Sequence, residues 1–172
     1  MSEATQLTLF DVSLPRVKRF RRSSADKAQR RARGRLVVAG GLVADKRGRL
    51  LLLHRSTPKL TWWETPGGKV DRGEGPRSAA IREFGEELGV EVSVVQDLGW
   101  HDLHSCGRPI RYALYLMRID NGTPCPIEEK LFDDLRWFSW LEILEMRHQL
   151  SPNANNVVDL FLAGRLSLDD FA

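Results

Sequence analysis

The feature that most constrains this chain is the stretch from Gly68 to Val90, GKVDRGEGPRSAAIREFGEELGV. Proline suits the first position of a helix and glycine suits the left-handed residue beyond its end, so Pro76 and Gly89 predict a helix over residues 76–88. At about 100° per residue, three glutamates fall on one face of this helix: Glu83, Glu86 and Glu87. The stretch therefore predicts an acidic helix face beside an apolar one.

The acidic face needs a compensating positive charge. Like charges three and four residues apart on a helix cost about 0.2–0.5 kcal/mol per pair. Arg82 can reach Glu86 across one turn, and a hard divalent cation, Mg²⁺ or Mn²⁺, would neutralise the cluster more fully through carboxylate oxygens. A solvated acidic face is the alternative, but it does not explain the glycines of the stretch.

The spacing of these residues resembles the Nudix box, in which a glycine and a glutamate precede an Arg-Glu-hydrophobic-any-Glu-Glu-any-Gly-hydrophobic run. All seven fixed positions are filled, by Gly68, Glu74, Arg82, Glu83, Glu86, Glu87 and Gly89. Phe84 departs mildly from the pattern, because the family usually has an aliphatic residue there. The approach WWETPGGK, residues 62–69, is also similar to that of many Nudix hydrolases. The resemblance implies an α/β fold, the Nudix α/β/α sandwich with a mixed sheet.

By the same resemblance, the box holds one or more divalent cations for hydrolysis of a pyrophosphate linkage in a nucleoside diphosphate derivative. The implied metal ligands are Glu83, Glu86, Glu87 and the carbonyl of Gly68, and Glu83 is also the first candidate for the base that activates water. Arg82 is expected to steer the glutamates and Glu74 to support them. The family often recruits another acid from a loop before the last strands. Glu129 is slightly favoured over Glu128 for this role, with a solvated acidic loop as the equal alternative.

A nucleotide substrate also needs groups that contact its base. Trp62 could stack on a base, an interaction worth about 1–3 kcal/mol in single-strand binding, although such residues are more often core. The segment SPNANNVVDLF loosely resembles the asparagine-bearing C-terminal segment of MutT-type enzymes. This resemblance implies that Asn155, or one of its neighbours Asn153 and Asn156, meets the base edge. Asparagines after a proline also serve as ordinary helix caps.

Positive charge concentrates near the N-terminus. Residues 16–35 hold ten Lys or Arg and one acid, Asp26, although the whole chain carries a net charge of only +3. We expect residues 1–34 to form a basic, flexible arm and residues 35–172 to form the Nudix domain. The arm could contact nucleic acid, but a solvated tail is favoured because Phe20 is the only aromatic residue within the basic run.

Composition excludes several classes of protein. A chain of 172 residues with 42% hydrophobic residues suffices for one domain with a sizeable core. Cys106 and Cys125 show no metal-binding spacing, so neither a disulfide framework nor a zinc site is indicated. No apolar run approaches the ~18 residues of a membrane span, and the N-terminus lacks the apolar core of a secretory signal. A cytoplasmic protein without membrane contact is therefore expected.

The remaining segments predict a sheet with two further helices. Apolar and β-branched runs predict strands over residues 36–44, 49–55, 91–98, 110–119 and 135–140. Turn-forming and polar residues predict loops over residues 56–65 and 99–109. Helices are predicted over residues 141–150 and 153–164, separated by Ser151-Pro152. This mixture of a sheet with helices agrees with the sandwich that the resemblance implies.

Three functions remain open, and they belong to different classes. The favoured one is a MutT-like hydrolase that converts a (d)NTP, with or without an oxidised base, to a nucleoside monophosphate and pyrophosphate. The second is a pyrophosphohydrolase of RNA 5′ ends, nucleotide sugars, dinucleoside polyphosphates or ADP-ribose, and the basic arm would support RNA. The third is a non-catalytic Nudix binding or regulatory module, against which the intact set of carboxylates argues.

Overall fold

The computed structural model describes residues 35–166. The predicted basic arm, residues 1–34, and residues 167–172 lie outside the described residues, so the predicted domain boundaries stay predictions.

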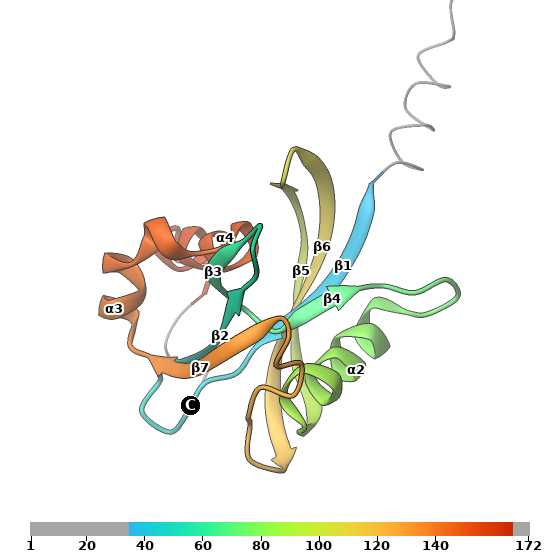
Figure 1. Ribbon diagram of the computed structural model, residues 1–172, viewed down its shortest axis with the longest axis horizontal. Helices are drawn as coiled ribbons and strands as arrows, with labels where there is room; N and C mark the ends of the chain where they lie inside the picture. Colours follow the sequence, from blue (N-terminus) through green and yellow to red (C-terminus); the bar gives the residue numbers. More distant parts are fainter. Residues whose placement is uncertain (1–34, 167–172) are drawn as a thin grey trace, which may run out of the picture. The chain divides into compact units, whose positions relative to one another are not determined.

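Two sheets form the centre of the domain (Figure 1). The four-stranded sheet has the order β4 (Gly67–Lys69), β1 (Leu36–Leu42), β6 (Arg108–Asn121) and β5 (Glu91–Ser105). The three-stranded sheet has the order β3 (Thr61–Glu64), β2 (Leu50–Ser56) and β7 (Phe132–Phe138). β1 pairs with β6 in parallel and with β4 in antiparallel orientation, so the predicted mixed sheet is confirmed.

Helices lie on both sides of these strands (Figure 1). The helix α2 (Pro76–Leu88) packs on one side. The other side is covered by α3 (Trp140–Glu145) and α4 (Pro152–Leu162), which are joined by the short 3-10 helix η1 (Arg147–Gln149). The layers are those of the predicted α/β/α sandwich. Within residues 35–166, no helix is long and apolar enough to cross a membrane.

The central strands are apolar on both faces because each face meets a different core. Leu50 and Leu52 of β2 pack in the core beneath α3 and α4, whereas Leu51 and Leu53 pack in the core beneath α2. Successive side chains of a strand point to opposite faces, and a sheet covered on both faces reads as a continuous apolar run. The run of four leucines in β2 is therefore a strand with two buried faces.

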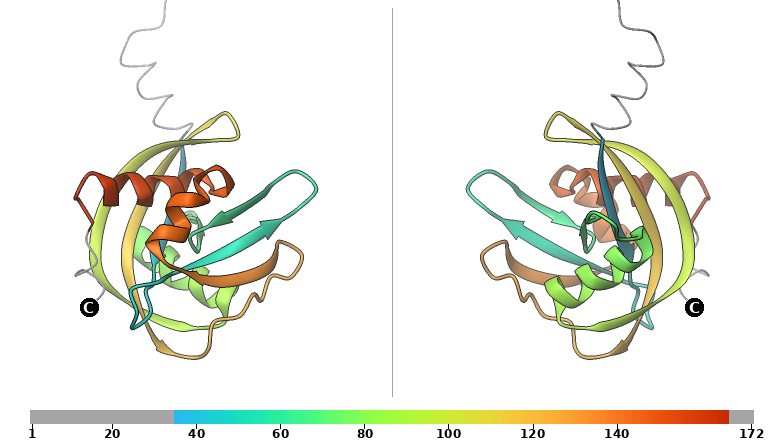
Figure 2. Two further views of the ribbon diagram at one scale, coloured as in Figure 1. Left: turned by 90° about the vertical axis from the view of Figure 1, so that its left-hand side faces the viewer. Right: turned by 90° about the vertical axis from the view of Figure 1, so that its right-hand side faces the viewer.

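The prediction of a loop over residues 99–109 was wrong. β5 and β6 form one long hairpin that turns at Cys106 and Gly107, which have φ of 50° and 74°, and it curves past α4 (Figure 2). β5 is an edge strand whose residues alternate between partly buried and exposed over residues 99–105, which gives this segment the polarity of a loop. Residues 56–65 also differ from the prediction, since Thr61–Glu64 pairs with β2 as β3.

Candidate active site

The acidic face belongs to α2, whose limits agree with the prediction. Pro76 occupies the first turn, and Gly89 adopts the left-handed conformation with φ of 66° after the last turn. The apolar face of α2 packs against β1 and β6, and Phe84 is fully buried in that core. This packing fixes the rotation of the helix and turns Glu83 and Glu87 toward β4.

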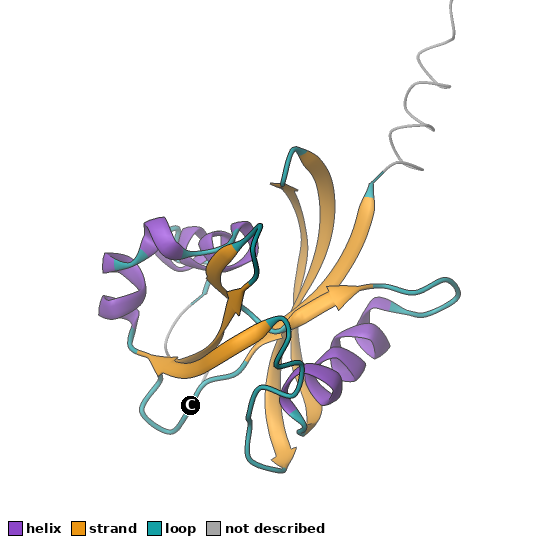
Figure 3. Ribbon diagram, in the orientation of Figure 1, coloured by secondary structure: helices purple, strands orange, loops and turns teal. Residues whose placement is uncertain are grey.

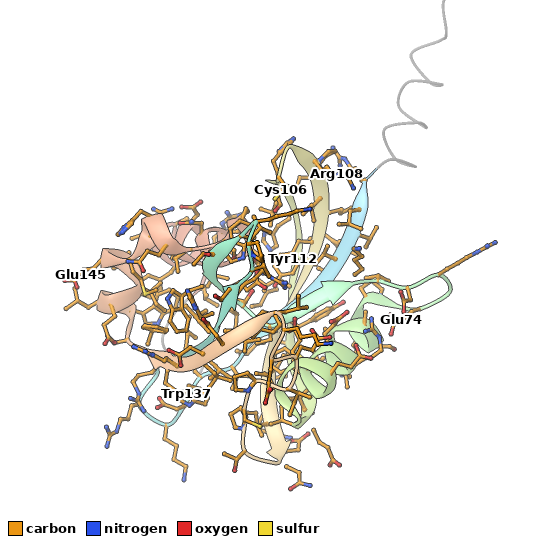
Figure 4. All side chains as sticks on the ribbon, viewed as in Figure 1. Glu74, Cys106, Arg108, Tyr112, Trp137 and Glu145 are labelled. Carbon is orange, nitrogen blue, oxygen red and sulfur yellow. The ribbon has the colours of Figure 1, made fainter. Side chains whose placement is uncertain are left out.

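Arg82 connects the glutamates of the box. Its Nη1 donates to Glu83 Oε1 at 2.9 Å and to Glu86 Oε2 at 2.6 Å. Its Nε and Nη2 donate to the two oxygens of Glu74 at 3.0 and 3.1 Å, and Nη2 also donates to the carbonyl oxygen of Lys69 at 3.0 Å. Glu74 lies on the loop between β4 and α2 (Figure 4). Arg82 therefore contacts three glutamates of the box, Glu74, Glu83 and Glu86.

Two carboxyl groups of the box are withdrawn from water. Burial raises the pKa of Glu87 well above its usual range, and the nearby charges of Glu64 and Glu83 add to this effect, whereas a hydrogen bond from Gly67 opposes it. Burial also raises the pKa of Glu83, against the opposing effect of Arg82. Glu86 differs, since its side chain is 53% exposed. The buried acids would gain from a cation that offsets the cost of their charge.

Gly68 allows the carboxylate of Glu83 to approach β4. A Cβ added at Gly68 would collide with all three carboxylate atoms of Glu83, so only glycine leaves room for this contact. The predicted metal ligands Gly68 and Glu83 therefore lie side by side. Oxygen donors of this kind suit Mg²⁺ or Mn²⁺.

The carboxylates do not form a closed metal cage in this structure. Within residues 35–166, no three acidic, histidine or cysteine side chains are arranged to hold a metal ion. Glu83 and Glu86 instead face the guanidinium of Arg82, and Glu87 Oε2 accepts a hydrogen bond from the Gly67 N–H at 2.8 Å. The donor set fits a hard cation in its chemistry. Glu83 and Glu86 both bind Arg82, whereas Glu83 and Glu87 lie against the neighbouring residues Gly68 and Gly67.

The loop between β6 and β7 brings a further acid to α2 (Figure 3). The backbone N–H groups of Cys125 and Ile127 donate to the last carbonyl groups of the helix, Leu88 O at 3.1 Å and Glu87 O at 2.9 Å. These bonds place Glu128 where its charge contributes to the raised pKa of Glu83. The predicted ligand Glu129 lies on the same loop, and its side chain is exposed.

A pocket of about 120 Å³ lies next to the acidic face. Gly67 is shared by both, because it lines the pocket while its N–H binds Glu87. Trp62, which the sequence suggested as a substrate-binding residue, lines the pocket. The full lining of the pocket consists of Val38, Arg55, Trp62, Glu64, Gly67, Leu103, Ser105, Ile110, Tyr112, Pro152 and Asn153.

The structure places Asn153, and not Asn155, in this pocket. Asn155 Nδ2 donates to the carbonyl oxygens of Arg147 and Leu150 at 3.2 and 3.1 Å, and Asn155 Oδ1 accepts from Arg147 Nε at 3.1 Å. The amide of Asn155 thus joins η1 to α4. The direction of a side chain at a helix start depends on the preceding turn, so the sequence alone did not separate the two asparagines.

Sequence reasoning missed Glu64 as a site residue. Glu64 is only 7% exposed, and its carboxylate accepts hydrogen bonds from Arg55 and Trp62. Burial raises its pKa, against the opposing charge of Arg55. Glutamates are mostly exposed in proteins, so only the burial seen in the fold marks Glu64 as a candidate site residue.

The chain is similar to proteins of one known family. The model of the NUDIX domain matches residues 34–161. The chain is 28% identical over 133 residues to the CTP pyrophosphohydrolase of Escherichia coli K12, a match that covers 76% of this chain and 95% of the relative. It is 34% identical over 61 residues to the 8-oxo-dGTP diphosphatase of Proteus vulgaris, which covers 34% of this chain and 54% of the relative.

Among solved structures, a MutT Nudix hydrolase from Burkholderia pseudomallei superimposes with a TM-score of 0.57 and 31% identity, over 62% of this chain and 84% of that one. The fold and the site define a hydrolase of phosphoric anhydride bonds. This chain belongs to the Nudix family, and it is a MutT-like Nudix hydrolase.

Proposed function

We propose that this protein hydrolyses nucleoside triphosphates to a nucleoside monophosphate and pyrophosphate, with Mg²⁺ or Mn²⁺ at the acidic face. One observation carries the proposal: the pocket that contains Trp62 and Glu64 adjoins the box through Gly67, whose N–H holds Glu87. A base in the pocket would leave its phosphate chain beside the carboxylates. A nucleoside triphosphate has this combination of a planar base and a compact anionic chain.

Glu83, Glu86 and Glu87, with the carbonyl of Gly68, would hold the cation. When bound, a divalent cation screens the phosphate charge and lowers the pKa of a water molecule. Of the two loop acids, Glu128 is better supported than Glu129 as a further ligand, because its charge acts on Glu83. Arg82 would retain its bonds to Glu74 and Lys69 O and keep the start of the acidic face fixed.

Glu83 is the candidate for orienting the attacking water and accepting its proton. Glu83 lies against Gly68 at the centre of the acidic face. In contrast, Glu87 already accepts a hydrogen bond from the Gly67 N–H, and Glu86 is exposed to solvent. A positioned base contributes about 10²- to 10⁴-fold to a rate. Glu83→Gln keeps the size of the side chain and removes both its ability to accept the proton and the negative charge that it would offer to the cation.

The test is to incubate the full chain with Mg²⁺ and each nucleoside triphosphate and to identify the products. Pyrophosphate with nucleoside monophosphate is expected, and orthophosphate with nucleoside diphosphate would refute the cleavage site. In Glu83→Gln we expect kcat to fall by about 10²- to 10⁴-fold with a nearly unchanged KM. Turnover close to that of the wild type would remove Glu83 from the mechanism.

A further inference from the structure

One face of the four-stranded sheet is covered by α2 only in part. On this face of β6, Tyr115 and Ala113 are buried in the core beneath α2, whereas Arg111, two residues before Ala113, is exposed. Side chains two residues apart in a strand share a face, so the cover ends between Ala113 and Arg111. Figure 1 and Figure 2 agree with this, because the outer half of the β5–β6 hairpin extends beyond α2. Within residues 35–166, no helix covers the outer end of this face.

Four residues on the uncovered face form what we call the outer strip: Arg35, Trp100, Asp102 and Arg111. Trp100 is 46% exposed, and Cζ of Arg111 lies 4.8 Å from the centroid of its ring. Arg35 Nη1 donates to Asp102 Oδ1 at 3.0 Å. Asp102 also lies opposite Arg111 in the register of β5 against β6. The four residues are therefore neighbours, although they come from three separate segments of the chain.

The outer strip and the pocket lie on opposite faces of the hairpin. Leu103 of β5 and Ile110 of β6 line the pocket, and they are the direct neighbours in sequence of Asp102 and Arg111. Successive side chains of a strand point to opposite faces. A ligand on the outer strip would therefore leave the pocket free, so this surface does not belong to the site of the proposed function.

Trp100 and Arg111 present two kinds of group to solvent. Tryptophan is highly buried on average, so a ring with nearly half of its surface in water is unusual. Within residues 35–166, Arg111 forms no ion pair, and Asp102 opposite it binds Arg35 instead. The guanidinium of Arg111 thus keeps N–H groups for an anion. An aromatic ring beside such a positive charge suits a ligand that has both a planar base and a phosphate.

A single exposed aromatic residue needs no explanation, but Trp100 lies where the basic run ends. Residues 16–34, which are outside the described residues, hold nine Lys or Arg and one acid, and the next residue is Arg35. The sequence favoured a solvated tail because Phe20 is the only aromatic residue in this run. The bond between Arg35 and Asp102 joins residues 67 positions apart and brings the end of the run close to Trp100. Positive charge and an aromatic ring, the two components of surfaces that bind single strands, thus occur together.

We propose that the outer strip is a docking surface for single-stranded nucleic acid. A base stacks on Trp100, while Arg111 and Arg35 bind the adjacent phosphates. A duplex keeps its bases stacked inside and contacts only the arginines. An acidic protein likewise matches the charge but offers no base to Trp100. The basic residues that precede Arg35 add positive charge to the same part of the chain, and this contribution falls with salt. The proposal does not rest on the proposed function.

The test measures the fluorescence anisotropy of a labelled oligoadenylate of about 12 nucleotides, a length within the range that one small domain binds. The full chain is used, in EDTA so that no metal-dependent cleavage occurs. For Trp100→Ala we expect at least about 5-fold weaker binding, the lower limit for the loss of one stacked base, and no change for a hairpin duplex. Trp100→Phe retains a ring and should bind nearly as the wild type does. Equal binding by Trp100→Ala and wild type, or an equal loss for duplex and single strand, would overturn the proposal.

Two further probes identify the chemistry of the partner. The same titration with oligodeoxyadenylate separates RNA from DNA, and a loss of affinity in Trp100→Ala with either strand supports the proposal. Labelled polyglutamate tests the alternative of an acidic protein. If its binding falls in Trp100→Ala as much as that of the oligoadenylate, the outer strip is a surface for acidic protein and the proposal is wrong.

A variant of Arg111 tests the contact with phosphate. Arg111→Gln should reduce the slope of log K against log salt concentration by about 0.7, the value for one phosphate contact of a single strand. Arg118→Gln is the matched control, because it also removes one positive charge from β6, and the side chain of Arg118 is 70% exposed and paired with Asp120, away from the outer strip. The slope of this control should equal that of the wild type. The same reduction in both variants would attribute binding to net charge alone and would contradict the proposal.

Discussion

The backbone N–H of Gly67 donates to the carboxylate of Glu87 at 2.8 Å, and this bond joins the pocket to the acidic face of α2. Gly67 belongs to the short strand β4, whereas Glu87 lies in the last turn of the helix. One hydrogen bond therefore fixes the distance between the group that would hold a base and the group that would hold a cation. In the proposed function, the base and the phosphates of the nucleotide would span this distance.

The first prediction concerns the binding of metal. Mg²⁺ or Mn²⁺ should raise the melting temperature of the wild type, because a ligand at 100 times its Kd stabilises the folded state by about 2.7 kcal/mol. The double variant Glu86→Gln, Glu87→Gln should lose this increase, since two of the three carboxylates no longer carry charge. Thermal denaturation with and without metal measures the effect. An equal response of variant and wild type would place the metal elsewhere.

The second prediction concerns pH and the stability of the metal-free protein. The pKa of Glu87 is higher in the folded than in the unfolded chain, where a glutamate ionises near ~4.3. Above ~4.3 the folded state retains a proton that the unfolded state has lost, so this group stabilises the fold less as the pH rises. Glu87→Gln removes this dependence and keeps an acceptor for Gly67. In EDTA it should melt above the wild type at pH 7.5, with a smaller difference at pH 4.5. A variant that melts lower at both pH values would contradict this.

The third prediction concerns the contact between Gly68 and Glu83. In Gly68→Ala the new Cβ would displace the carboxylate of Glu83, which is the end of a flexible side chain, so the fold should persist. A displacement of about 1 Å can cost about 10²-fold in rate, and we expect kcat to fall by about that factor. Gly75→Ala is the control, because its Cβ would meet nothing within 4 Å and its φ is −84°. Similar rates for both variants would show that the contact has no catalytic importance.

The fourth prediction separates the two asparagines of α4. Asn155→Ala removes hydrogen bonds to Arg147 and Leu150, so the free energy of unfolding should fall by about 1–3 kcal/mol. The preference among bases should stay as in the wild type, because Asn155 lies outside the pocket lining. Urea denaturation and the ratio of kcat/KM for CTP to that for UTP are the two measurements. A changed ratio with unchanged stability would contradict this prediction and indicate that Asn155 contacts the substrate.

The fifth prediction concerns the basic arm. Deletion of residues 1–33 should leave a folded enzyme that still hydrolyses small nucleotides, because the family match begins at residue 34 and the box lies beyond it. Circular dichroism and a turnover assay measure this result. A deletion variant that fails to fold would show that the arm packs on the domain. Loss of RNA binding alone, with a steep dependence on salt, would instead support an RNA substrate.

The sequence by itself determined α2 and its acidic face. Pro76, Gly89 and the spacing of the glutamates act within a few residues, and local backbone preferences and a 3.6-residue period can be read from a single chain. The leucine run of β2 likewise indicated a buried strand. The polar outer half of the β5–β6 hairpin was missed because an edge strand exposed on one face has the composition of a loop.

Only the tertiary structure decided how the pocket is built. The bonds between Asn153 and Thr65 join residues 88 positions apart, and the pairing of Glu64 with Arg55 depends on the register of β2 against β3. The choice of Asn153 over Asn155 and the effect of the Glu128 charge on the pKa of Glu83 arise in the same way. Burial and side-chain direction at these positions depend on how distant segments pack, and no local pattern in the sequence contains that information.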